Sequence, residues 1–119
     1  LYAAAYEQIK RNMALLKPGL GYRELTEKLH PMADEFVPGR YGVAMHGVGL
    51  FDEAPAIYYP QDYAEFGYDG VFEEGMVVCV EALIGTDGGR ECVKLEEQVL
   101  ITADGHEQLT TYPLEEHWV

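Results

Sequence analysis

One histidine and several carboxylates stand in strand-like parts of the sequence, a combination that can bind a metal ion. They are His46 in "YGVAMHGVGLFDEAP" (41–55), Glu81 in "GMVVCVEALIG" (75–85), and Glu96 and Glu97 in "KLEEQVLI" (94–101). An imidazole with two carboxylates is an oxygen-rich donor set that suits Mn, Fe or Co as well as Zn. A lone histidine such as His46 is more often a core or loop residue than a ligand, so the prediction depends on the carboxylates.

Glu81 is predicted to enter a buried strand, because apolar residues occupy both faces of segment 75–85. Burying a carboxylate is unfavourable unless the group is paired, protonated or bound to a metal ion. We therefore expect Glu81 to be a metal ligand or a catalytic group. The alternative is a strand end at which this carboxylate meets solvent.

The adjacent acids Glu96 and Glu97 point to opposite faces of any regular strand. Strict alternation groups Glu97 with apolar neighbours such as Val99, and Glu96 with Lys94, so the pattern itself favours Glu97 as the inward acid. A β-bulge would reverse this choice. The pair is also consistent with an ordinary solvated strand face.

Two helices followed by several strands are expected to position these groups. Apolar residues spaced by three and four predict an amphipathic helix over residues 1–16 and a second one over 22–37, in which Pro31 marks a kink or a boundary. Short apolar runs separated by Gly, Pro and Asp follow, and the turn "ADG" (103–105) predicts a β-hairpin. This order predicts an α+β fold.

Composition limits the classes of partner. The chain has 119 residues, enough for one domain, and a formal net charge of −13, which repels phosphate backbones and anionic membranes. We expect no nucleic-acid partner and, since no apolar run has the length of a membrane span, a cytoplasmic protein without a membrane partner. Cys79 and Cys92 are expected to be reduced, partly buried thiols.

Four segments resemble the pita-bread metalloenzymes of the M24 family, which includes methionine and Xaa-Pro aminopeptidases, prolidase and creatinase. They are "YEQIKRNMALLKPGLGYREL", "HGVGL", "FEEGMVVCVEALIG" and "KLEEQVLITADGHEQLTTYP". The resemblance implies that residues 1–119 are a single partial catalytic domain, the C-terminal half of a pita-bread fold. The N-terminal part, with two metal-binding aspartates, would precede Leu1.

The same resemblance assigns metal ligands. The family pattern places a ligand directly after a basic and an aliphatic residue, as in Lys94-Leu95-Glu96, so Glu96 replaces Glu97 as the expected ligand. The implied ligand set is His46, Glu81 and Glu96, holding one or two divalent ions (Fe, Mn, Co or Zn) in the complete protein. A homodimer acting on a small-molecule substrate is also implied, and the 119-residue chain is expected to be inactive alone.

Within the family, the chain is most similar to the DddP-type dimethylsulfoniopropionate lyases. The segments "RYGVAMHGVGLFDEAPAIYYPQDY" and "KLEEQVLIT" carry this similarity. It implies a β-elimination in which Asp52 is the catalytic base and Tyr41 lines the pocket, with Tyr58 and Tyr59 either facing the sulfonium cation or packing in the core. Asp52 stands where the peptidases have a histidine, and a carboxylate there would repel the oxyanion of amide hydrolysis.

Two other functions are considered. The first is a metal-dependent hydrolase of the same family, of the Xaa-Pro aminopeptidase, prolidase or creatinase kind. The second is a pita-bread domain that has lost its metal and serves as a binding module. Two aspartates in the upstream sequence would favour an enzyme.

Overall fold

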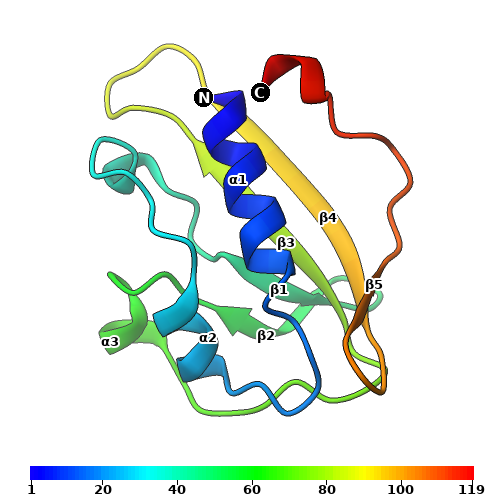
Figure 1. Ribbon diagram of the computed structural model, residues 1–119. Helices are drawn as coiled ribbons and strands as arrows, with labels where there is room; N and C mark the ends of the chain where they lie inside the picture. Colours follow the sequence, from blue (N-terminus) through cyan, green and yellow to red (C-terminus); the bar gives the residue numbers. More distant parts are fainter.

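A five-stranded antiparallel sheet with the order β2-β1-β3-β4-β5 is the centre of the fold. A computed structural model describes residues 1–119 (Figure 1). The strands are β1 (Met45–Val48), β2 (Asp52–Ile57), β3 (Val77–Ile84), β4 (Val93–Ile101) and β5 (His106–Gln108). The long strands β3 and β4 pair without a register shift from Val77↔Leu100 to Ile84↔Val93. This register places Glu81 of β3 directly opposite Glu96 of β4.

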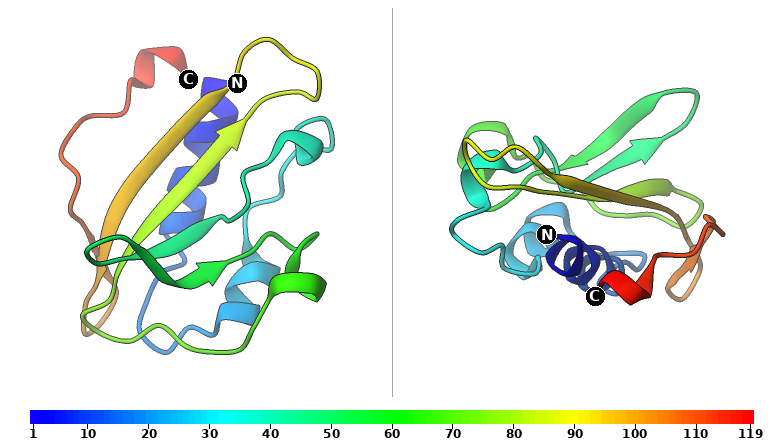
Figure 2. Two further views of the ribbon diagram at one scale, coloured as in Figure 1. Left: turned by 180° about the vertical axis from the view of Figure 1, so that it is seen from behind. Right: turned by 90° about the horizontal axis from the view of Figure 1, so that it is seen from above.

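The helices lie beside this sheet. They are α1 (Tyr2–Met13), α2 (Tyr22–Lys28) and α3 (Tyr63–Phe66), with single 3₁₀ turns at Val37–Gly39 and Glu116–Trp118. The view from above shows α1 and α2 together on one side of the sheet, so that neither covers its other face (Figure 2). This arrangement confirms the predicted α+β class.

The first helix forms as predicted, because its apolar residues recur at helical spacing. Ala5, Ile9 and Met13 are buried at intervals of four residues and face β3 and β4. The second helix is shorter than predicted. It ends at Lys28 rather than at residue 37, since Pro31 disfavours a helical conformation at the residue before it and cannot donate a backbone hydrogen bond.

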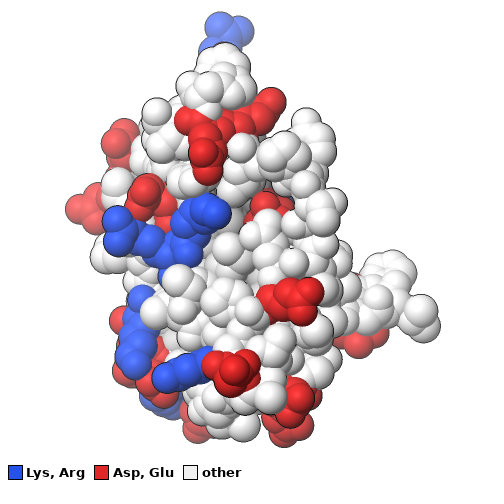
Figure 3. All heavy atoms as spheres, turned by 45° about the vertical axis from the view of Figure 1, so that its right-hand side comes forward, with Lys and Arg blue, Asp and Glu red and all other residues white.

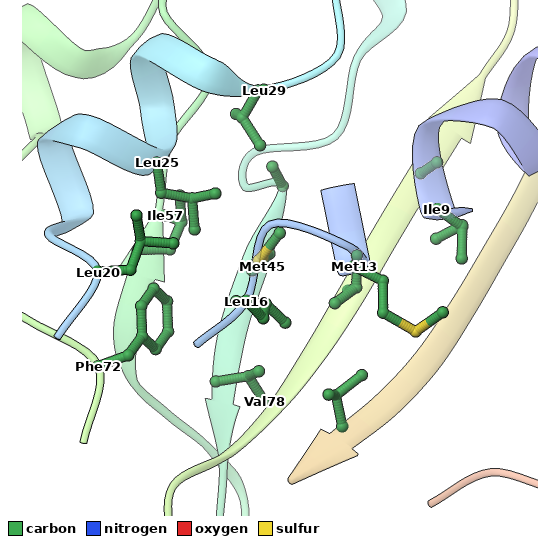
Figure 4. Close-up of a cluster of buried hydrophobic side chains, with 14 of the residues drawn as sticks. Ile9, Met13, Leu16, Leu20, Leu25, Leu29, Met45, Ile57, Phe72 and Val78 are labelled. Atoms are coloured by element: carbon green, nitrogen blue, oxygen red, sulfur yellow. The ribbon is translucent and has the colours of Figure 1, made fainter. Parts of the chain in front are cut away.

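The hydrophobic core fills the space between the helices and one face of the sheet. Figure 4 shows Leu20, Leu25 and Phe72 gathered around Ile57, next to Met45 and Leu16. From β3, Val78, Val80, Ala82 and Ile84 enter this core and are fully buried. Strand alternation then directs Cys79 and Glu81 to the opposite face.

The predicted hairpin is confirmed, since β4 and β5 pair antiparallel on either side of residues 103–105. The chain then returns along the sheet so that its two ends lie close together (Figure 1). There the backbone N–H of Glu115 donates to the Tyr2 hydroxyl at 2.7 Å, and the Tyr6 hydroxyl donates to Glu116 at 3.1 Å. The C-terminal segment thus fastens to the start of α1.

The surface and the thiols add three findings. Acidic side chains are scattered over the face in Figure 3, while most lysine and arginine side chains lie along one side of it. Both cysteines are free: Cys79 is buried, but Cys92 is exposed, contrary to the expectation that both are partly buried. No helix combines the length and apolar character needed to span a membrane.

Candidate functional site

His46, Glu81 and Glu96 come together on the face of the sheet that α1 and α2 leave uncovered. The Nε2 atom of His46 on β1 lies 2.7 Å from Oε1 of Glu81 on β3. Glu96 on β4 is the direct cross-strand partner of Glu81. Three consecutive strands of the sheet therefore contribute one side chain each.

The backbone around His46 fixes its orientation. Its Nδ1 atom lies 2.9 Å from the carbonyl oxygen of Gly47, which can only accept a hydrogen bond. Nδ1 is therefore placed to donate a hydrogen bond to this carbonyl, and Nε2 faces Oε1 of Glu81. Metal-binding histidines use the same arrangement, in which the second ring nitrogen donates to a carbonyl or a carboxylate.

A bulge in the β1–β2 pair brings Asp52 near this histidine. The register shifts between His46↔Ala56 and Gly47↔Glu53, so that two residues of β2 have no partner there. Gly47 permits the close approach, because a Cβ atom at this position would lie 2.1 Å from the carbonyl oxygen of Ala54. Oδ1 of Asp52 then lies 3.9 Å from Nδ1 of His46, with 80% of its side chain exposed.

Lys94 links the two carboxylates. Its Nζ atom lies 2.7 Å from Oε2 of Glu81 and 3.3 Å from Oε2 of Glu96. The hydrogen bond to Glu81 raises the pKa of the Lys94 ammonium above its ordinary value, so the group stays charged. The positive charge offsets part of the cost of burying Glu81, which has no solvent exposure.

Glu96 is held ionised by its neighbours. Burial alone would raise its pKa, but hydrogen bonds from the Cys79 thiol and from Lys94 outweigh it, so that the pKa of Glu96 is lowered. His46, Cys79 and Glu96 offer a nitrogen, a sulfur and an oxygen atom that all lie within 4.8 Å of one another. A buried carboxylate, an available imidazole nitrogen and an ionised glutamate are groups that fit a divalent ion.

Tyr41 lies at the edge of the same group. The Nζ atom of Lys94 is 4.5 Å from the centre of the Tyr41 ring, within the range of a cation–π contact. The two other tyrosines considered differ from each other. Tyr59 is buried in the core, which settles its packing role, whereas Tyr58 packs its ring against Phe66 with centroids 5.6 Å apart.

Glu97 faces the other side of the sheet. It is buried beside Val99 and Ile101, as alternation predicted, and its carboxylate accepts a hydrogen bond from the Thr110 hydroxyl. The inward acid of the strand and the acid near His46 are thus different residues. No bulge is needed to place Glu96 opposite Glu81, because the regular ladder already does so.

Two members of this group were not predicted. Lys94 and Cys79 each stand two residues before a glutamate of the group, which puts them on the same strand face. This two-residue spacing could have indicated from the sequence that Lys94 and Cys79 lie beside the glutamates. Sequence reasoning had assigned Cys79 only to a buried thiol.

The sequence comparisons identify the family. The sequence profile of metallopeptidase family M24 matches residues 1–103. The chain belongs to family M24. It is 49% identical over 111 residues to the dimethylsulfoniopropionate lyase DddP of Roseovarius nubinhibens, with 93% of this chain and 25% of that protein covered. The lyase DddP of Roseobacter denitrificans is also 49% identical, over 92% of this chain and 24% of its own length.

Solved structures of this family share the fold. The X-Pro aminopeptidase of Thermotoga maritima superposes with a TM-score of 0.73 at 27% identity, over 96% of this chain and 31% of that one. The prolidase of Pyrococcus furiosus has a TM-score of 0.70 at 31% identity, over 94% of this chain and 32% of its own. These matches confirm the pita-bread fold. The chain spans about a quarter of the length of the lyases that it matches.

Proposed function

We propose that this chain is the C-terminal part of a metal-dependent lyase that cleaves dimethylsulfoniopropionate to dimethyl sulfide and acrylate. The observation that carries the proposal is the 49% identity to two lyases of that name over more than nine-tenths of the chain. The position of Asp52, 3.9 Å from His46, supports it. Because the chain spans about a quarter of those relatives, the activity would belong to a longer protein, in which upstream aspartates complete the metal centre.

His46, Glu81 and Glu96 would hold the metal in this proposal. Their donor types fit Fe, Mn, Co or Zn, as one or two divalent ions. A bound ion would supply Lewis acidity, lowering the energy of the negative charge that develops when a substrate carboxylate loses its α proton. Glu81 is suited to this role, because an ion would share with Lys94 the neutralisation of this buried carboxylate.

Asp52 would be the catalytic base. Its carboxylate takes the proton from the carbon next to the substrate carboxylate, and the released electron pair forms the double bond between the α and β carbons. The bond from the β carbon to sulfur breaks, and dimethyl sulfide leaves with that bonding pair, so that acrylate remains. Tyr41 would face the sulfonium cation through its ring, as aromatic residues do around positively charged methylated groups.

A second candidate function has a specific observation in its favour. The Xaa-Pro dipeptidase of Pyrococcus furiosus is 35% identical to the chain over 115 residues. Peptide hydrolysis passes through an oxyanion, however, and a carboxylate at position 52 would repel it. The lyase is therefore the better supported reaction.

One experiment separates the two functions. The complete protein is loaded with Fe²⁺ or Mn²⁺ and given dimethylsulfoniopropionate in one vessel and a proline dipeptide in another. The proposal predicts dimethyl sulfide in the headspace, lost on adding EDTA, and no free proline. Proline release without dimethyl sulfide would replace the lyase by the peptidase.

The proposal extends to assembly and location. We infer a homodimer in the cytoplasm that acts on a small molecule and binds neither nucleic acid nor a membrane. The free thiols support the cytoplasm, and the net charge of −13 opposes binding to nucleic acid and to anionic membranes. The dimer follows only from the family resemblance. Light scattering of the complete protein during gel filtration tests the dimer, and a monomeric mass would refute it.

A further inference from the structure

A cavity of about 460 Å³ opens beside the Tyr41 ring, where β1 begins and β2 ends. Besides Tyr41, it is lined by two further aromatic residues, Tyr58 and Phe66, and by Pro38. Tyr41 and Phe66 are exposed, and Tyr58 is only partly buried. The proposed mechanism gives Tyr58 and Phe66 no role, although both side chains are open to a ligand.

An ion pair holds the two sides of this cavity together. Arg40 donates from Nε and Nη2 to the two carboxylate oxygens of Asp62, and from Nη1 to the carbonyl oxygen of Val37. Asp62 directly precedes α3, which carries Phe66. Because a bidentate pair fixes geometry, it holds the segment that carries Tyr41 against the start of α3. The cavity is therefore shaped by residues of this chain before any ligand binds.

The chemistry of the cavity suits a cation that carries methyl groups. The rings of Tyr58 and Phe66 lie with centroids 5.6 Å apart and planes inclined by 30°, so that their faces point in similar directions. Ring faces attract cations, and cages of such rings recognise methylated ammonium groups. The charged residues of the lining, Arg40 and Asp62, neutralise each other. The aromatic faces are thus the feature that selects a ligand.

The cavity lies next to the proposed metal centre, because Tyr41 borders both. The Nζ atom of Lys94 is 2.7 Å from Oε2 of Glu81 and 4.5 Å from the centre of the Tyr41 ring. In dimethylsulfoniopropionate, three covalent bonds separate the sulfur atom from the carboxylate carbon. A substrate whose carboxylate binds beside Glu81 can therefore extend its sulfonium group towards Tyr41 and the cavity.

We propose that Tyr58 and Phe66 join Tyr41 in an aromatic cage that binds the dimethylsulfonium group and determines specificity for a methylated cation. This inference rests on the proposed function. The sulfur atom carries its positive charge in the bound substrate and loses it as dimethyl sulfide leaves. Removing a ring should therefore weaken substrate binding more than it slows the reaction of bound substrate.

The rate of dimethyl sulfide release by the metal-loaded complete protein tests the cage. Tyr58→Leu and Phe66→Leu keep an apolar side chain but remove the ring, and each should raise KM by about 3- to 30-fold with a much smaller change in kcat. Tyr58→Phe restores the ring and should restore the KM that Tyr58→Leu loses. Trp118→Leu, at an exposed position of the C-terminal turn, controls for the loss of an aromatic residue elsewhere.

Two probes without a sulfonium group separate charge from shape. One is 3-(trimethylammonio)propanoate, which carries a methylated cation, and the other is 4,4-dimethylpentanoate, which has the same shape with carbon in place of nitrogen. Isothermal titration of the Mn²⁺-loaded complete protein measures both affinities. The wild type should bind the cation about 3- to 30-fold more tightly, and Tyr58→Leu and Phe66→Leu should lose most of this preference.

The outcomes separate the cage from the lyase. If dimethyl sulfide is released but the wild type binds both probes equally, or KM is unchanged in Tyr58→Leu and Phe66→Leu, the cage is refuted and the lyase stands. Equal weakening of both probes in these variants would show a packing role and refute the cage as well. If no dimethyl sulfide is released, the lyase is refuted, whereas a preference for the cation that depends on Tyr58 and Phe66 would still support the cation site.

Discussion

The Nζ atom of Lys94 lies 2.7 Å from Oε2 of Glu81, so that a partly exposed ammonium neutralises a fully buried carboxylate. The Lys94 side chain is 41% exposed and reaches the site from the neighbouring strand. In the absence of a divalent ion, Lys94 is the main positive charge beside Glu81. The stability of this site should therefore depend on Lys94 when metal is removed and much less when metal is bound.

Replacing Lys94 by methionine tests this dependence. Breaking a buried ion pair costs about 3–5 kcal/mol, and the partial exposure of Lys94 should reduce the loss to roughly 2 kcal/mol in EDTA. Added Mn²⁺ should restore most of it, since the ion supplies the missing charge. Urea unfolding of the complete protein with EDTA and with Mn²⁺ measures both values.

Lys28→Met is the matched control for this change. Lys28 pairs with Glu24 on the surface of α2, where a solvent-exposed pair contributes little to stability. A Lys94→Met protein that loses no more stability in EDTA than Lys28→Met would show that Glu81 does not need this counter-ion.

The two cysteines should differ in reactivity. Burial and the hydrogen bond to Glu96 raise the pKa of Cys79 to about 12, whereas Cys92 is exposed. Because the thiolate is the reacting form, iodoacetamide at pH 8 should modify Cys92 and leave Cys79 unmodified in the folded protein. Mass spectrometry of tryptic peptides reads both sites, and urea should expose Cys79. Equal labelling of the two in the folded state would contradict the buried, hydrogen-bonded thiol.

Glu97 should make stability depend on pH. Burial raises its pKa, against smaller lowering effects of Gln108 and Lys10, from an ordinary value of 4.5. Between the unfolded and folded pKa values the folded protein holds a proton that the unfolded chain has lost, so stability falls as pH rises through that window. Glu97→Gln removes this contribution while keeping an acceptor for Thr110.

The stability difference between Glu97→Gln and the wild type should therefore grow in favour of the variant above about pH 4.5 and then level off. Urea unfolding at half-unit steps of pH measures it. Glu107→Gln, at an exposed position of β5, is the control. A Glu97→Gln difference that stays constant across this range would refute the effect of burial.

The fold could be predicted largely from local patterns. The spacing of Ala5, Ile9 and Met13 determines α1, and the turn at residues 103–105 determines the last hairpin, because each signal lies within a few neighbouring residues. The end of α2 could be placed less well. The apolar spacing continues beyond Lys28 and would by itself predict a longer helix. Only the backbone restriction that Pro31 imposes on the residue before it indicates that the helix ends earlier.

The candidate site could be predicted only in part. Side-chain alternation along β4 correctly predicted that Glu97 faces the hydrophobic core. It could not show that Glu81 and Glu96 gather on the opposite face of the sheet. Cys79 acquires its neighbours because β1 pairs with β3 and sets His46 opposite it. The sequence of one strand does not show which residues of another strand it will face. Alternation along residues 94–101 favoured Glu97, and only the family resemblance indicated Glu96.

The most direct test of the central claim is the rate of dimethyl sulfide release by Asp52→Asn in the metal-loaded complete protein. General-base catalysis contributes about 10²- to 10⁴-fold, so the rate should fall at least about a hundredfold while metal binding is kept. Glu53→Gln, at the next residue of β2, should retain most of the activity. An Asp52→Asn protein that releases dimethyl sulfide at the wild-type rate would contradict Asp52 as the base and the lyase mechanism built on it.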